Sequence, residues 1–171
     1  QLAQFEAVFR LRRADGQYRW MKTVAKPRFV DRGTFIGYAA CTLEIHDRKI
    51  AEAQLALLAA VVNSSQDAIY SFTPDARILS WNSAAETLFG WTEAEVLGQP
   101  ADLLAPPELV AERARLIETV LRGESVSQFE TVCMRKDGSR FDAVLTFSPV
   151  AAQHKIVGMS AITRDITERK R

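Results

Sequence analysis

Two stretches of the chain alternate apolar and polar residues on both sides of an Asp-Gly pair. The first begins at Phe5–Arg10 and turns at Asp15-Gly16, and the second begins at Phe129–Val132 and turns at Asp137-Gly138. A period of two residues is typical of half-buried strands, and Asp-Gly is a strong hairpin signal. Each stretch is therefore predicted to form three consecutive antiparallel strands. The face of the second stretch that we expect to meet the core carries Phe141, Ala143, Leu145 and Phe147.

The two stretches are copies of one unit. They end alike, with Glu44–Lys49 closing the first copy and Asp165–Lys170 closing the second. Self-similarity of this kind indicates that one structural unit occurs twice in a chain. We therefore expect both copies to form the same three-stranded arrangement.

The residues between the copies, 46–65, have the apolar spacing of a helix. Leu55, Leu58 and Val62 continue a coiled-coil spacing that begins at Ala51. Further apolar residues widen the stripe, which predicts that the helix packs against something besides water. Two interpretations stay open: a dimer helix that pairs through Leu55, Leu58 and Val62, and an ordinary helix that faces a core.

After this helix the pattern predicts two short strands, at about 67–73 and 77–81, joined by a turn at Pro74-Asp75. Ser83 is predicted to cap a helix, with Glu86 completing a capping box.

Pro106-Pro107 is predicted to open a longer helix that ends before Gly123. Three strands follow, so the fold class is α+β with one antiparallel sheet. The apolar face expected on the long helix carries Val110, Ala114, Ile117 and Leu121.

Composition adds little that is specific. The 171 residues are 47% hydrophobic, and 22 Lys and Arg balance 21 Asp and Glu to a net charge of +1. Because no basic block is long enough to form a binding patch, we expect no nucleic-acid partner. No apolar run approaches the roughly 20 residues that span a bilayer, so direct membrane insertion is not expected.

The two cysteines, Cys41 and Cys133, lie far apart and outside any metal-binding spacing. Neither a disulfide framework nor a zinc site is predicted, and a reducing cytoplasm fits this usage. Cys133 is interpreted as a small buried apolar residue. The initial Gln1 suggests a fragment of a longer chain, so a membrane anchor elsewhere in the parent stays open.

No catalytic or metal-binding pattern is found. The sequence contains no Gly-rich phosphate loop, no nucleophile and base arrangement, and no acidic cluster at metal-ligand spacing. His46 aligns with Thr167 of the second copy, so it is interpreted as a helix-start residue and not as a phosphate acceptor. The chain is therefore not expected to be an enzyme.

These patterns resemble the PAS family of sensor domains. Trp81–Glu86 and Leu88–Gly98 resemble the front half of such a domain, and Arg135–Phe141 and Arg164–Lys170 resemble its back half. The first copy is similar only to a back half, and its Glu44-Ile45-His46 departs from the usual Asp-Ile-Thr ending.

The resemblance implies a five-stranded antiparallel sheet flanked by short helices. It divides the chain into the back half of a first PAS domain (1–45), a linker helix (46–65), a complete PAS domain (66–167) and the start of an outgoing helix (168–171). Alternation places eight residues on the concave face of the complete sheet, as a candidate ligand pocket: Tyr70, Phe72, Thr131, Cys133, Leu145, Phe147, Ala161 and Thr163.

The resemblance also implies which residues a bound haem or covalent flavin would require. Haem-binding members use a His on the long helix, where residues 109–121 contain none, and covalent flavin needs a Cys that Ser83–Gly98 lacks. Haem is therefore not expected, and a packed core without cofactor is the interpretation. A non-covalent flavin or another small ligand stays open.

The implied function is sensory signal transfer by a homodimer, ahead of a histidine kinase in the same parent chain. A diguanylate cyclase output and a ligand-free dimerisation scaffold are the alternatives. Asp165, Ile166 and Thr167 form the predicted signal-transfer junction, where Thr167 is expected to cap the outgoing helix and Asp165 to hold the strand end.

Overall fold

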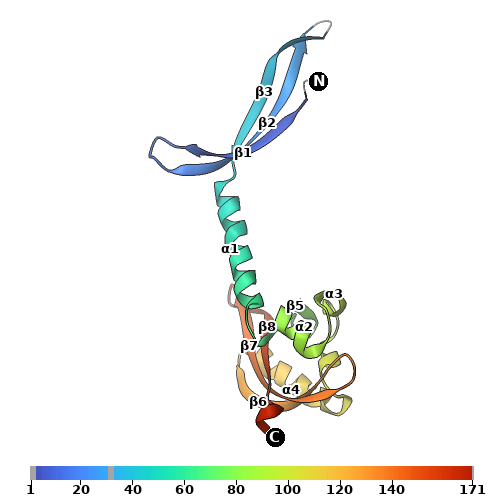
Figure 1. Cartoon of the computed structure of the whole chain (residues 1–171). Coiled ribbons are helices and arrows are strands. Elements are labelled where there is room, and N and C mark those ends of the chain that lie inside the picture. Colours follow the sequence, from blue (N-terminus) through green and yellow to red (C-terminus); the bar gives the residue numbers. More distant parts are fainter. Residues whose placement is uncertain (1–2, 31–32, 171) are drawn as a thin grey trace. The chain divides into compact units, whose positions relative to one another are not determined.

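The computed structural model describes residues 3–30 and 33–170 and contains two compact units, Gln1–Ala59 and Ala60–Arg171 (Figure 1). Helix α1 (His46–Asn63) begins in the first unit and ends in the second.

The first unit contains a three-stranded antiparallel sheet in the order β1-β2-β3. Its strands are β1 (Phe5–Arg12), β2 (Tyr18–Val30) and β3 (Thr34–Glu44). The predicted hairpin is present, and the Asp15 carboxylate accepts a hydrogen bond from the Gln17 amide at 2.9 Å. Among the described residues of this unit, only Ala25 is buried.

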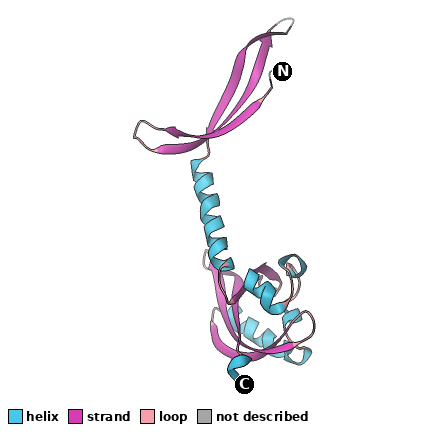
Figure 2. Cartoon of the chain, in the orientation of Figure 1, coloured by secondary structure: helices cyan, strands magenta, loops and turns pink. Residues whose placement is uncertain are grey.

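The second unit contains a five-stranded antiparallel sheet in the order β5-β4-β8-β7-β6, with helices between β5 and β6 (Figure 2). The predicted fold class is confirmed. The strands are β4 (Ala68–Phe72), β5 (Ile78–Trp81), β6 (Val126–Met134), β7 (Arg140–Ala152) and β8 (Lys155–Asp165). The helical elements are α2 (Ser83–Phe89), α3 (Glu93–Val96), η2 (Ala101–Leu104), η3 (Pro107–Leu109), α4 (Val110–Leu121) and η4 (Glu168–Lys170).

The core of the second unit lies between the sheet and its helices. The alternating apolar residues of β4 and β7 point into it, and the buried rings pack edge to face or tilted. The Tyr70 ring lies 4.9 Å from Trp81 and 5.7 Å from Phe89, distances at which aromatic pairs stabilise beyond their buried area.

The cap of α2 is Asn82 and not Ser83, so the prediction was wrong by one residue. The side-chain oxygen of Asn82, Oδ1, accepts a hydrogen bond from the Ala85 amide at 2.9 Å, and its Nδ2 donates to the Val62 carbonyl at 3.0 Å. The Ser83 hydroxyl instead donates to the Asn63 carbonyl at 2.8 Å. Both residue types are good caps, and contact with the end of α1 decides between them.

The buried face of α4 also differs from the prediction. It carries Arg113, Ile117 and Val120, whereas Ala114 is exposed. Arg113, a charged residue, occupies the interior position that the sequence pattern assigned to its neighbour Ala114.

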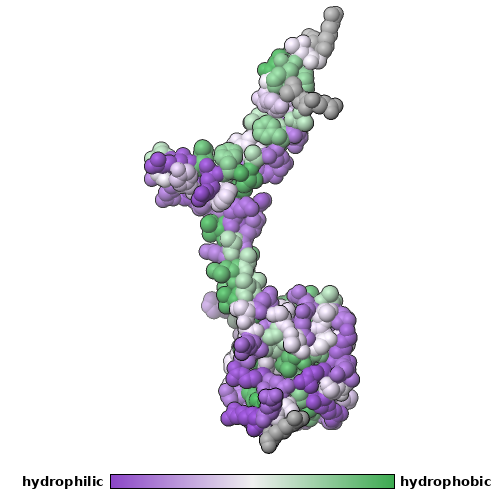
Figure 3. Space-filling view, in the orientation of Figure 1, coloured by the Kyte–Doolittle hydropathy of each residue, from purple (hydrophilic) through white to green (hydrophobic). Residues whose placement is uncertain are grey.

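No side chain of α1 is buried. Leu55 and Leu58 are 68% and 62% exposed, and Figure 3 shows apolar side chains gathered along this helix. The apolar stripe predicted from the sequence is therefore uncovered in the single chain.

Candidate functional site

The eight predicted pocket residues lie on one face of the five-stranded sheet, on β4, β6, β7 and β8. Seven of them are buried and Thr131 is half-buried. Tyr70 and Thr163 are joined by a hydrogen bond of 2.7 Å between their hydroxyls. The cavity beside Thr131 and Leu145 has a volume of only about 10 Å³, about the space of one water. Side chains therefore fill this part of the concave face.

The space between the concave face of the sheet and the helices, which we call the cup, contains a charged residue, Arg113. The sequence interpretation did not identify this residue. It is 4% exposed, and its guanidinium donates to the Ala101 carbonyl at 3.2 Å and lies 3.7 Å from the Cys133 sulfur. Across residues 3–30 and 33–170 it forms no ion pair with a carboxylate. The position could have been suspected, because Arg113 precedes Ile117 and Val120 at helical spacing.

Burial changes the pKa values of two groups near Arg113, the Tyr70 hydroxyl and the Cys133 thiol. Burial raises the pKa of the Tyr70 hydroxyl to about 12, with the nearby guanidinium acting in the opposite direction. Burial likewise raises the pKa of the Cys133 thiol, again opposed by Arg113. Both groups are therefore protonated at neutral pH, which suits a packing role better than a nucleophilic one.

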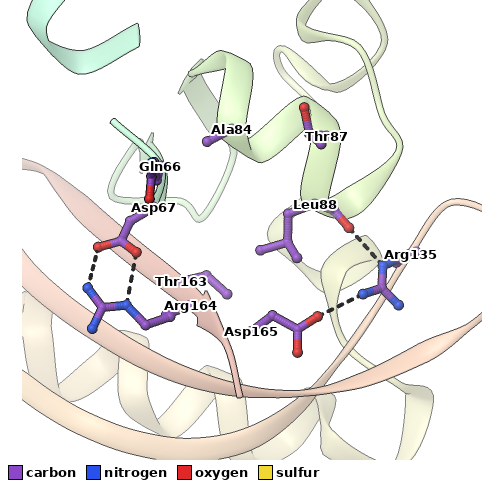
Figure 4. Close-up of a pocket in the computed structure, with 9 residues that line it drawn as sticks. All are labelled: Gln66, Asp67, Ala84, Thr87, Leu88, Arg135, Thr163, Arg164 and Asp165. Carbon is purple, nitrogen blue, oxygen red and sulfur yellow. Dashed lines mark hydrogen bonds and ion pairs between the residues drawn. The ribbon is translucent and has the colours of Figure 1, made fainter. Parts of the chain in front are cut away.

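A second feature is an open groove of about 650 Å³ outside the core. It lies where the chain reaches β4 and where it leaves β8, and α2 forms one wall (Figure 4). We call it the junction groove. Its lining residues are Gln66, Asp67, Ala84, Thr87, Leu88, Arg135, Thr163, Arg164 and Asp165.

Two arginines connect the elements around the junction groove. Arg164 on β8 binds Asp67 through both carboxylate oxygens, at 2.9 and 2.6 Å. Arg135, from the hairpin between β6 and β7, donates to the Leu88 carbonyl on α2 and to Asp165, each at 2.9 Å (Figure 4). The start of β4, the end of β8 and the end of α2 are thereby held together.

The predicted junction residues make specific contacts. The Asp165 carboxylate pairs with Arg135 at 2.9 Å and accepts a hydrogen bond from the Thr167 amide at 2.8 Å. Ile166 is buried, and its amide donates to the Asp142 carbonyl at 2.9 Å.

The Thr167 hydroxyl does not cap the outgoing helix, contrary to the expectation from the sequence. It accepts from the Asp142 amide on β7 at 3.2 Å. The amides of Arg169 and Lys170 bond to the Ile166 carbonyl instead. Thr167 therefore links the segment that follows β8, which we call the exit of the domain, to strand β7.

The ion pair of Asp67 and Arg164 should make stability depend on pH. The hydrogen bond from Arg164 holds the pKa of Asp67 below its ordinary value of 3.8. A lowered native pKa contributes stability that is complete above the unfolded pKa and is lost as pH falls through the native value. We expect Asp67→Asn to reduce the free energy of unfolding by about 0.5–1 kcal/mol at pH 7, because the pair is partly exposed.

Urea unfolding of wild type and Asp67→Asn between pH 7 and pH 3 measures this difference. It should be constant down to about pH 4 and shrink below it. Asp102→Asn, at an exposed position on η2, is the control and should show no such difference. A difference that grows on acidification would contradict the assignment.

In the described part of the chain, no group of three or more His, Cys, Asp or Glu residues is placed to hold a metal ion. No helix in that part is long and apolar enough to cross a membrane.

Comparison with known proteins identifies relatives over both units. Two-component system protein A of Emericella nidulans is 35% identical over 108 residues, 60% of this chain and 15% of that protein. Sensor protein FixL of Bradyrhizobium diazoefficiens is 24% identical over 177 residues, 97% of this chain. The chain spans only 15% and 34% of the lengths of these two relatives.

A solved structure with a similar fold is the PAS domain of a protein from Colwellia psychrerythraea, with 27% identity and a TM-score of 0.63, covering 68% of this chain and 99% of that one. The family described as PAS fold matches residues 62–171. Since that match covers more than half of the chain, the chain belongs to the PAS family, and its second unit is a PAS sensor domain.

Proposed function

We propose that this chain is a non-catalytic sensory and signal-transfer segment of a cytoplasmic sensor histidine kinase, in which two PAS units are joined by α1. The observation that carries the proposal is the similarity to Sensor protein FixL over 97% of the chain, which includes both units and the helix between them. The relative named as a two-component system protein supports the same class of parent.

The junction groove supplies the transfer mechanism. Arg164 with Asp67 and Arg135 with Asp165 connect the first and last strands of the domain to each other and to α2. A rearrangement at the start of β4 or in α2 changes these contacts, and the position of the exit after Ile166 changes with them. A difference of a few kcal/mol between two such arrangements is enough to shift their populations.

The proposed working state is a homodimer that pairs through α1. The helix exposes Leu55 and Leu58, and exposed apolar surface of this extent is unusual on a monomer. A heptad-like stripe is buried when a second, identical helix packs against it.

The cup is proposed to work without a bound cofactor. Arg113 and the aromatic side chains occupy its interior, and the void beside Thr131 holds at most one water. We therefore expect protein purified from its own host to be colourless. An absorption band at about 400–450 nm, where haem and flavin absorb, would contradict this.

Incubating the purified parent protein with radiolabelled ATP tests the kinase proposal. The expected result is a phosphate on the parent that is stable to base and labile to acid, as a phosphohistidine is. Formation of a cyclic dinucleotide from GTP, with no labelled protein, would assign the segment to a cyclase instead.

A further inference from the structure

The sheet of the first unit has the same strand register as part of the second. The hairpins β2–β3 and β7–β8 also shift register at matching points, after Arg28 in the first unit and after Val150 in the second. The matching opposed pairs are Leu11–Arg19 with Cys133–Phe141, Met21–Glu44 with Ala143–Asp165, Ala25–Ala40 with Phe147–Ala161, and Pro27–Tyr38 with Pro149–Met159. Strands β1-β2-β3 are therefore the counterparts of β6-β7-β8.

In the second unit, the far edge and the inner face of this sheet are covered. Strand β4 pairs with the edge of β8 over five residues, from Ala68 opposite Thr163 to Phe72 opposite Met159. At the centre of this pairing a large side chain of β4 meets a small one of β8, since Tyr70 is directly opposite Ala161. The inner-face residues of the pairing are all buried: Ala68, Tyr70, Phe72, Met159, Ala161 and Thr163.

In the first unit, the corresponding surface is bare. Phe5 is 49% exposed and Leu11 is 51% exposed, and the rings of Phe5 and Phe35 contact Tyr38 at 5.6 and 5.4 Å to form one apolar patch. In the described part of the chain, no strand pairs with the second edge of β3. A bare apolar face beside an open strand edge is a surface on which another strand can dock.

The side chains of β3 indicate what kind of strand fits. Ala40 and Thr42 are the counterparts of Ala161 and Thr163, and they leave the same room on the inner face. With Ala40 opposite Ala40, a second copy of β3 would place two alanines together where the second unit has Tyr70 opposite Ala161, and the space left between them would lower stability. Strand β4 of a second copy is already paired on both edges. The surface therefore fits a separate strand with large alternating apolar residues, like β4.

We propose that the inner face of this sheet and the open edge of β3 bind an antiparallel strand, and the helices that follow it, from a segment that precedes Phe5 in the parent polypeptide. The order is that of the second unit, in which β4 and the helices precede β6. The proposal rests on the tandem arrangement proposed above, and it specifies the edge, the face and the position at which the first PAS unit is completed.

Hydrogen exchange of the parent protein and of the 171-residue chain, read by mass spectrometry on peptides that contain β3, tests the proposal. We expect exchange in β3 to be at least about tenfold slower in the parent, because the edge amides are hydrogen-bonded only there. Equal and fast exchange in both proteins would overturn the proposal. So would slow exchange of β3 in the 171-residue chain, since the edge would then be covered without any preceding segment.

Two neighbouring alanines provide a matched pair of variants. Ala40→Trp adds bulk on the inner face, and Ala39→Trp adds the same bulk on the opposite face, and both positions are exposed in this chain. In the parent, Ala40→Trp should abolish the slow exchange of β3 while Ala39→Trp preserves it. Equal effects of the two variants would contradict docking on the inner face. The phosphorylation assay is read separately, so a parent without kinase activity that still protects β3 rejects only the proposed output.

Discussion

Arg113→Ala is expected to lower the free energy of unfolding of the PAS unit by about 3 kcal/mol, because truncation leaves a cavity in the core and an unpaired Ala101 carbonyl. Arg113→Met should stay within about 1 kcal/mol of wild type. The methionine fills most of the space, and the lost hydrogen bond is offset because a guanidinium without a carboxylate partner no longer has to be buried.

Urea unfolding followed by tryptophan fluorescence measures both variants. Arg115 is the matched control, since it is an exposed arginine two residues further along α4, and its Ala and Met variants should change stability by less than about 0.5 kcal/mol. If Arg113→Met is as destabilised as Arg113→Ala, the charge itself is required in the core. That outcome would point to an anion bound beside Arg113 and would contradict the proposal of a cup filled by side chains alone.

Leu55→Glu combined with Leu58→Glu should weaken dimerisation at least about 100-fold. Each change removes an apolar side chain worth about 1.5–3 kcal/mol when buried, and two facing charges are added per helix. Sedimentation of the 171-residue chain over a range of concentrations measures the association.

The control for this variant is Ala53→Glu combined with Ala56→Glu, which adds the same charges at the same spacing on the opposite side of α1. It should leave association unchanged within about threefold. If both double variants associate as wild type does, α1 is not the interface. If both dissociate equally, net charge and not the apolar stripe is responsible.

The sequence predicted the fold well because its signals are local and periodic. Alternation on both sides of Asp137-Gly138 predicts which residues of β7 face the core, and the structure shows them buried: Phe141, Ala143, Leu145 and Phe147. The order of two strands, helices and three strands predicted an α+β fold with one antiparallel sheet, and the resemblance to the PAS family implied that this sheet has five strands.

The features that the sequence did not predict depend on contacts between distant residues. Asn82 and Ser83 are equally good caps, and the structure adds hydrogen bonds from Asn82 to the end of α1 and to the start of β4 that the local sequence does not reveal. Arg113 shares the helical spacing of Ile117 and Val120, but arginines are mostly exposed, and its burial follows only from the enclosure by η2 and β6. The pairing of Arg164 with Asp67 joins residues 97 positions apart, so no local pattern announces it.

Signal transfer through the junction is tested by the output activity of the parent protein carrying Asp165→Ala or Thr167→Ala. Each change removes a contact that fastens the exit of the domain, to Arg135 in the first case and to the Asp142 amide in the second. Asp102→Ala, at an exposed position on η2, is the control. We expect both junction variants to change the basal output activity of the parent, while the melting temperature of the domain stays within about 5 °C of wild type. Normal folding together with wild-type activity, with and without stimulus, would contradict signal transfer through this junction.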